Sequence, residues 1–583
     1  MRLRFSDCIS TIKYQWDSRF DAVFTGSISG RERSRMAIEF CHHCLLKVVP
    51  TDDGSCPQCR LPIEKSKYLP QISENPKKQD TFSKASIPET EPDRFFRIAT
   101  LIGITLCSAL IIFAVGTRKI LMLQDLPDHI GRAAILKDFF FSPFFQEYFR
   151  LTWFPPPYIL PDVVNALLLI FFDPATTTKI YALFSVFFMV AGVVFCIHRN
   201  APAHEEIALF SFTIALTNVF FKGNLNFLLG TGLLFFLVGY WWPNRLKTSP
   251  RQDLAIAIAG LGLYGVHLVC LLTWYLIFSI SFFWRHARAE TIEWKKIWPL
   301  VPSLILTVCF FLWDGSGATT NADELVIRGA SVVTISNIVA NIKTLRIFFG
   351  VTESSSWIPF LPVFALYSGL AIFSFIQSKF SEKWLIFFIL VAGFLIAPIE
   401  LPNLVRPGER LLFITFFWGL LLIQYPVSLH KTIRLIWIIV MCVSCALQTL
   451  RFQAAEKSFE QSYLSYYNGL KTLPKNCIAC PVKFHTAKLY QHIDKFLLAE
   501  RQSIVPGIFM PKHIIVRYRK SLPVPPTPPC ITPEMLHTYR YFILSGTSPQ
   551  VEELILQGTF KIRWHDQEVA IIENGDFVPM AAK

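Results

Sequence analysis

Charged residues are scarce in this chain. Only 17% of its 583 residues are Asp, Glu, Lys or Arg, whereas an average soluble domain has about 25%. Hydrophobic residues make up 52%, and 54 positions are Phe. This composition leaves too little polar surface to cover a soluble globule of this size. It excludes an intrinsically disordered chain, a coiled coil, a collagen-like repeat and a secreted disulfide-rich scaffold, and it predicts a polytopic membrane protein.

A concentrated basic segment is also lacking. The formal net charge is +14, but the lysines and arginines are scattered among the segments between apolar runs. In a soluble protein such an excess would suggest nucleic-acid binding. In a membrane protein, loop cations commonly set the orientation of the spans. We therefore expect membrane lipids as partners and no nucleic acid.

The start of the chain has no apolar core and hence no signal-peptide pattern. Residues 1–35 show no clear period and stay unassigned. Residues 36–63 contain a C-x2-C-x11-C-x2-C pattern, formed by Cys41, Cys44, Cys56 and Cys59. Two such knuckles supply four thiolates in a tetrahedron, with no position left open for water, so the pattern predicts a zinc ribbon with structural zinc. A redox pair and unligated cysteines are the alternatives.

A polar linker and a long apolar region follow. Residues 64–94 are rich in Lys, Glu, Pro and Ser, which indicates a flexible linker. Residues 95–450 are predicted to form an all-α polytopic domain with about 11–13 transmembrane helices. The run 159–172 is marginal and could be a short span, a re-entrant segment or an interfacial helix. Runs long enough to span a bilayer begin near residues 95, 178, 205, 225, 252, 266, 296, 357, 383, 411 and 432.

Residues 451–583 are polar enough to form a soluble domain. Strand-like runs at 513–516 and 541–544 predict a small α/β domain. Cys477 and Cys480, with Cys530 farther on, favour a structural disulfide there over a redox pair.

Basic residues alternate between successive loops. If the N-terminus is cytoplasmic and the run 159–172 does not cross, the opposite loops hold few cations: Lys222, Arg406 and Arg410. The pattern is typical of positive-inside topology and predicts a multi-pass inner or plasma membrane protein whose C-terminal domain lies outside. The cytoplasmic loops would hold Arg199, Arg245, Lys247, Arg251, Arg285, Arg288, Lys295, Lys296, Lys379, Lys383 and Lys431.

The loop after the first predicted span concentrates functional groups. Asp125, Asp128, His129 and Arg132 fall within eight residues, directly beyond an apolar helix. Polar groups at a membrane border are costly and indicate function. The alternative is that Asp125 only caps a helix with Pro127 in its first turn, and that the other groups are solvated.

Three further polar segments interrupt apolar regions. They are residues 222–226 with Asn224, residues 260–267 ending at His267, and a loop with Arg406 and Arg410. The predicted orientation places all three on the same face as Asp125, so we expect one outward-facing polar site walled by helices. Taken singly, His267 could be a hydrogen-bonded helix histidine and the two arginines headgroup anchors.

This layout resembles the GT-C superfamily of membrane glycosyltransferases, which take sugars from polyprenyl-phosphate carriers. The stretch Asp125-Leu126-Pro127-Asp128-His129 stands where those enzymes have an acidic motif after the first span. The stretch 133–152 resembles their membrane-parallel helices, and residues 223–230 and 406–413 are similar to a bacterial, mostly uncharacterised branch. The resemblance covers the chain from about residue 95 onward. The zinc ribbon has no counterpart in it and could dock a cytoplasmic partner.

The resemblance implies inverting transfer of a hexosyl or pentosyl group from a polyprenyl-phosphate-linked donor to an unknown acceptor. Asp125 would be the general base or would orient the acceptor, with Asp128 and His129 tuning it. Some members use a divalent cation, although this sequence has no clear oxygen-ligand cluster beyond the two aspartates. The implied substrate-binding residues are Arg132, Asn224, His267, Arg406 and Arg410, of which the last two would hold the carrier phosphate.

Two other classes of function remain open on the sequence. A polytopic transporter or lipid flippase often shows two similar halves with paired broken helices, and no such internal repeat is evident. A non-catalytic membrane scaffold whose zinc module docks a partner is the other alternative.

Overall fold

The computed structural model describes residues 39–41, 46–48, 91–312 and 335–577. Within the two long ranges the gaps are 153, 246–248, 288–293, 352–356, 379, 399, 402–403, 406, 426–429, 485–491, 509–514, 521, 527–528, 547–548, 567–568 and 576. The chain divides into two compact units, Met1–Ile87 and Pro88–Lys583.

The described part of the first unit is a small antiparallel hairpin. Strand β1 (Glu39–Cys41) pairs with β2 (Leu46–Val48), and the register sets Cys41 opposite Leu46. Cys44, Cys56 and Cys59 lie outside the described residues. The zinc ribbon therefore stays a prediction.

The second unit is a helical bundle, as the composition predicts. Seven of its described helical segments are long and apolar enough to cross a membrane. They correspond to seven of the predicted runs, those near 95, 178, 225, 266, 296, 357 and 432. The segments are α2 (Glu91–Gly116), α6 (Pro174–Asn200), α9 (Leu225–Trp241) with η2 (Trp242–Asn244), α11 (Leu268–His286), η3 (Trp294–Leu300) with α12 (Val301–Leu312), η5 (Ile358–Phe360) with α14 (Leu361–Gln377), and α17 (His430–Leu470).

Shorter helices occupy three other predicted runs. Helices α10 (Pro250–Val266), α15 (Glu382–Ile396) and α16 (Pro407–Leu420) match the runs near 252, 383 and 411. Helix α5 (Ile159–Phe171) is the marginal run; its 13 residues are fewer than the roughly 20 that a span needs. Helix α13 (Ile335–Phe348) precedes η5.

The run near residue 205 was predicted to be one membrane-spanning helix, but it is not a single helix. It forms the short helices η1 (Pro202–Leu209), α7 (Phe210–Thr213) and α8 (Asn218–Phe221). Its interrupted backbone is paired within the protein: Asn218 N donates to Gly350 O at 2.7 Å, and Gln448 Nε2 donates to Leu216 O at 2.8 Å. Broken helices at membrane depth are tolerated where protein covers them, and residues 206–221 are buried throughout.

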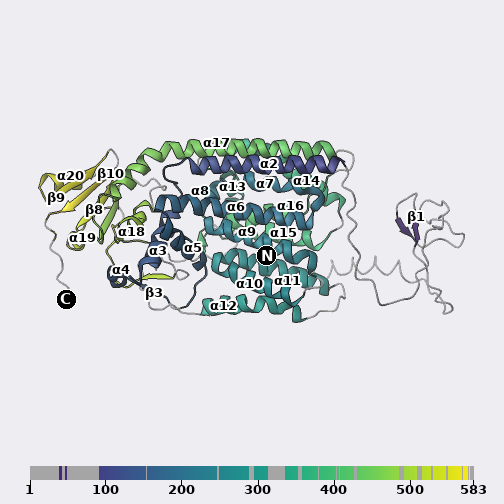
Figure 1. The fold of residues 1–583 in the computed structure, drawn as a ribbon, viewed down its shortest axis with the longest axis horizontal. Coiled ribbons are helices and arrows are strands. Elements are labelled where there is room, and N and C mark those ends of the chain that lie inside the picture. Colours follow the sequence, from purple (N-terminus) through teal and green to yellow (C-terminus); the bar gives the residue numbers. More distant parts are fainter. Residues whose placement is uncertain are drawn as a thin grey trace, which may run out of the picture. The chain divides into compact units, whose positions relative to one another are not determined.

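Helices α2 and α17 lie side by side along the bundle (Figure 1). Near their starts the Arg434 guanidinium lies over the Phe96 ring at 4.2 Å, and near the end of α2 Arg118 lies 3.6 Å from Glu460. The two helices therefore run in the same direction. We call the end of the bundle where α2 stops the site end, and the end where α17 starts the basic end.

Cations gather at the basic end. Arg245 pairs with Glu382, and Arg285 donates to Arg245 O at 3.4 Å. Lys296 lines the same small pocket as Arg245 and Arg285. Lys383 and Lys431 line a separate cavity of about 950 Å³. Predicted cytoplasmic loops that are distant in sequence therefore meet at one end of the bundle.

The C-terminal part is an α/β domain, as predicted. Its sheet has the order β6-β8-β10-β9, and only the β6–β8 pair is parallel. Residue 451, the predicted start of this domain, lies within α17, which continues without a break to Leu470. The sheet follows α17 in the chain. The elements are β6 (Ala479–Lys483), η8 (Ile493–Lys495), α18 (Phe496–Arg501), β7 (Val516–Tyr518), α19 (Pro533–Thr538), β8 (Tyr541–Ser545), α20 (Pro549–Leu556), β9 (Phe560–His565) and β10 (Val569–Asn574).

The expected disulfide in this domain is not formed. Cys477, Cys480 and Cys530 are all free thiols. Cys477 and Cys480 are three residues apart along an extended segment, so their side chains point to opposite faces. Cys480 is buried in β6, and the Sγ atom of Cys477 lies 3.4 Å from Ser503 Oγ.

The α2–α6 loop (residues 117–173) packs against the C-terminal domain. It contains α3 (Leu126–Asp138), α4 (Pro143–Tyr148), β3 (Phe149–Leu151) and α5. Strand β3 pairs antiparallel with β7, and Thr152 N donates to Ile515 O at 2.8 Å. On α3, a Cβ at Gly131 would lie 2.9 Å from Leu498 Cδ1 and 3.1 Å from Lys495 O. This docking brings the C-terminal domain directly over the acidic motif.

Candidate functional site

Asp125 stands immediately before α3 but does not cap it. The residue occupies the N-cap position, yet its side chain makes no capping hydrogen bond. Pro127 lies in the first turn, as predicted, where its missing N–H costs nothing. The Asp125 side chain is 44% exposed. The capping alternative therefore does not account for this carboxylate, which is open to a ligand.

A second segment fixes the backbone at Asp125. The amide of Gln124 donates to Phe221 O and that of Asp125 donates to Lys222 O, both at 3.1 Å. Gly223 has φ +80°, and a Cβ there would lie 2.9 Å from Asp125 N. Only glycine satisfies both the left-handed conformation and the close approach.

The start of α16 joins the same group. Lys222 Nζ donates to both carboxylate oxygens of Glu409, at 3.0 and 2.9 Å, and Arg410 Nη2 donates to Asn224 Oδ1 at 3.2 Å. The predicted convergence of the Asp125, 222–226 and 400–410 segments is thus confirmed for the described residues. Arg406 lies outside them. The remaining two-residue strands β4 (Glu400–Leu401) and β5 (Leu404–Val405) pair with each other just before α16.

His267 stands at the break between α10 and α11. It is 3% exposed, and its ring packs edge-on against Tyr158 at 4.9 Å and Phe227 at 5.2 Å between ring centroids. These contacts fix the turn between the two helices. They give His267 a supporting position rather than an open one.

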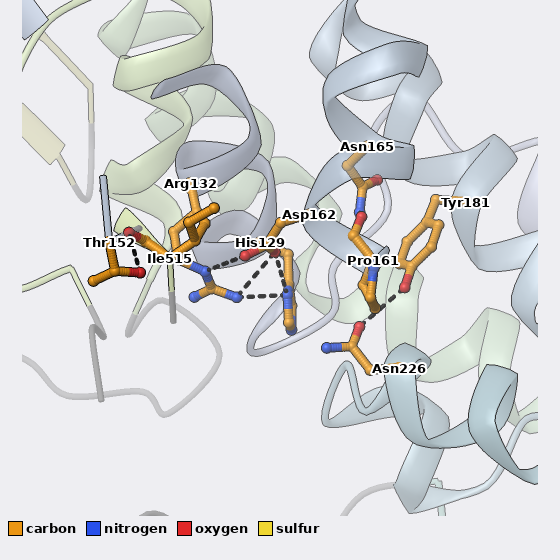
Figure 2. Close-up of polar contacts among 9 residues, drawn as sticks. All are labelled: His129, Arg132, Thr152, Pro161, Asp162, Asn165, Tyr181, Asn226 and Ile515. Atoms are coloured by element: carbon orange, nitrogen blue, oxygen red, sulfur yellow. Dashed lines mark hydrogen bonds and ion pairs between the residues drawn. The ribbon is translucent and has the colours of Figure 1, made fainter. Parts of the chain in front are cut away.

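Arg132 and His129 meet Asp162 of α5 in a buried polar cluster (Figure 2). Arg132 Nε lies 3.1 Å from Asp162 Oδ2, and its Nη2 donates to His129 Nδ1 at 2.6 Å. Arg132 and Asp162 are 2% and 1% exposed. The substrate-binding role expected for Arg132 is therefore corrected: its guanidinium is buried and joins α3 to α5.

Figure 2 also shows a neighbouring polar contact between α6 and α9, in which Tyr181 OH donates to Asn226 Oδ1 at 2.9 Å. Asn165 Nδ2 donates to Pro161 O at 2.9 Å within α5. Polar side chains thus continue from α3 across the site end of the bundle.

Sequence reasoning missed the group closest to the two aspartates. His492, just before η8, places Nδ1 2.8 Å from Asp128 Oδ2 and Nε2 3.9 Å from Asp125 Oδ1. Behind it, buried Asp494 contacts Lys483 Nζ at 2.7 Å and Lys495 Nζ at 2.6 Å. The sequence signal is three titratable residues in the four positions 492–495, but nothing local connects them with a motif more than 350 residues away.

The two aspartates have opposite pKa shifts. Burial alone would raise the pKa of Asp128, but the His492 charge and hydrogen bond, with Lys495 and Arg132, outweigh it and lower that pKa. The surrounding protein raises the pKa of Asp125, against the attraction of His492 and His129. Carboxylates whose environments separate their pKa values are typical of acid–base sites.

The described residues hold no group of three or more His, Cys, Asp or Glu that could bind a metal ion. Their chemistry at the site end is instead a carboxylate pair, the imidazoles of His492 and His129, and nearby cations. Such a set can take up a proton and attract an anionic group.

Comparisons with known proteins show the fold. No protein-family model and no curated protein matches the chain. The crystal structure of ArnT from Cupriavidus metallidurans bound to undecaprenyl phosphate matches it with a TM-score of 0.51 and 12% identity, over 82% of this chain and 99% of that one. The apo form of the same protein matches with a TM-score of 0.49 and 12% identity, over 81% and 97%. The chain therefore has a GT-C-like membrane fold.

Proposed function

We propose that this chain is a membrane glycosyltransferase that moves a sugar from a polyprenyl-phosphate-linked donor to an acceptor hydroxyl. The observation that carries the proposal is Asp125, a carboxylate that caps nothing and is open at the site end of a GT-C-like bundle. The ArnT structure with its bound undecaprenyl phosphate supports a carrier of this class.

The proposed reaction is inverting transfer. Asp125 accepts the proton of the acceptor hydroxyl while that oxygen forms a bond to the anomeric carbon. The bond from that carbon to the phosphate oxygen breaks, and its electron pair leaves with the polyprenyl phosphate. A positioned general base typically contributes about 10² to 10⁴-fold to such a step.

The leaving phosphate needs fixed positive charge. Arg410 is the described cation best placed for this role, because Asn224 orients its guanidinium and its charge acts on Asp125. Lys222 is held by Glu409 and so serves mainly to fix the segment. We propose that Arg406 adds to this group.

We propose further that the basic end faces the cytoplasm and the site end the outer side, because loop lysines and arginines are retained inside. Reporter fusions at Ser249, which caps α10 at the basic end, and at the exposed Glu534 of α19 test this orientation. The Ser249 reporter is expected inside and the Glu534 reporter outside. Both reporters on one side would contradict the orientation.

The function itself is tested by the fate of a lipid-linked sugar. Membranes containing the chain are expected to release polyprenyl phosphate and to pass the sugar to a new product, and membranes without it are not. Movement of an intact lipid-linked sugar across the membrane, without cleavage, would instead indicate a transporter or flippase.

A further inference from the structure

His492 comes from the C-terminal domain, yet it stands between the two carboxylates of the α2–α6 loop. Its Nδ1 faces Asp128 at 2.8 Å and its Nε2 faces Asp125 at 3.9 Å. The His492 side chain is 16% exposed, and that of Asp128 is 4% exposed. The ring therefore holds one carboxylate by direct contact and faces the other across a gap.

We propose that His492 is a positioning residue that completes the acidic site from the C-terminal domain: it pairs with Asp128 and so leaves Asp125 as the one carboxylate free to take the acceptor proton. This inference rests on the proposed function. It assigns the two aspartates different roles, which their spacing in the sequence does not.

The charges around the ring fit this role. Asp125 and Asp128 face it from the α2–α6 loop, and the charge of Arg132 acts on Asp128. Other groups nearby are Lys483 on β6, Asp494 and Lys495 on η8, Tyr518 on β7 and Arg410 on α16. Asp494 engages both lysines, and the His492 ring lies in direct contact with Asp128.

The charges of Asp125 and Asp128 determine in which direction the loss of the His492 charge shifts the pH dependence of the reaction. Burial would lower the pKa of His492, but Asp128 and Asp125 together raise it. The imidazolium in turn lowers the pKa of Asp125. Without that cation the neighbouring Asp128 charge opposes ionisation of Asp125, so a higher pH is needed to form the base.

Docking of the domain makes the contact possible. The β3–β7 pair and the close packing of Gly131 against Lys495 and Leu498 fix η8 against the start of α3. Lys495 Nζ also donates to Pro506 O at 2.7 Å, which holds η8 within its own domain. The contacts of η8 with α3 and with its own domain thus hold His492 beside the two aspartates.

The test compares His492→Gln, which removes the charge, with His492→Lys, which keeps one, in the full-length chain. His492→Gln is expected to move the acid limb of the kcat profile to higher pH with little change in KM for the donor. His492→Lys is expected to return the limb toward its original position. The control is His537→Gln, at an exposed position of α19, which should leave the profile unchanged.

An unchanged acid limb in His492→Gln would overturn the proposal. So would equal losses in both variants accompanied by faster proteolysis of the C-terminal domain, because that result indicates a purely structural contact.

A readout independent of activity separates this inference from the proposed function. Histidine-labelled protein has 13 imidazoles, and the His492 signal is identified by its loss in His492→Gln. Its pKa is expected to fall in Asp128→Asn, and an unchanged pKa would contradict the pairing. A fall in that pKa in a protein that transfers no sugar would support the pairing and refute the glycosyltransferase assignment.

Discussion

Asp125→Asn is expected to lower turnover by about two or more orders of magnitude, the usual scale for losing a general base. The amide is nearly the same size and cannot accept the proton. The backbone contacts of residue 125 with Lys222 do not involve the side chain, so folding should be retained. The measurement is kcat for sugar transfer by purified protein, with KM for the donor nearly unchanged.

Glu147→Gln is the matched control for this variant. Glu147 is an acidic residue of the same α2–α6 loop, but its side chain is 49% exposed and contacts Lys520 on the surface. The turnover of Glu147→Gln should equal that of the wild type. Wild-type transfer by Asp125→Asn would place the base elsewhere, and Asp128 would be the next residue to test.

Asp162→Ala is expected to destabilise the protein by about 3–5 kcal/mol, because it leaves the Arg132 guanidinium buried without its partner carboxylate. The measurement is reversible unfolding in detergent. The double variant Asp162→Ala with Arg132→Met should recover much of this loss, because it removes both charges from the buried position.

The exposed Lys520–Glu147 pair provides the comparison. Its side chains are 52% and 49% exposed, so Glu147→Ala should cost far less stability than Asp162→Ala. A similarly small loss for Asp162→Ala would show that Arg132 finds another partner, and would contradict its assignment as a buried anchor between α3 and α5.

Features with a local physical signature were predictable from the sequence. Apolar runs such as 178–200 match helices, because lipid demands both length and hydrophobicity. The α/β character of the C-terminal domain followed from its strand-like runs. The meeting of Asp125 with residues 222–226 and Arg410 followed from the alternation of basic loops, which assigned them to one face before any contact was known.

Features that depend on tertiary packing were not predictable. The segment near 205 is apolar enough to span, but its backbone is interrupted, and Gly350, just beyond α13, and Gln448 of α17 supply hydrogen-bond partners there. The burial of Arg132 depends on Asp162, which lies in the marginal run. His492 reaches the aspartates because β7 pairs with β3 and because η8 and α18 pack against α3. None of these contacts has a signature within its own stretch of sequence.

The most direct test of the central claim is the fate of a polyprenyl-phosphate sugar labelled in both the sugar and the lipid. The purified chain is reconstituted in vesicles with this donor and with membrane extract as the source of acceptors. The two labels are expected to separate, with the lipid recovered as polyprenyl phosphate and the sugar in a new product, and Asp125→Asn is expected to prevent the separation. Labels that stay together in the presence of folded wild-type protein would contradict the glycosyltransferase assignment.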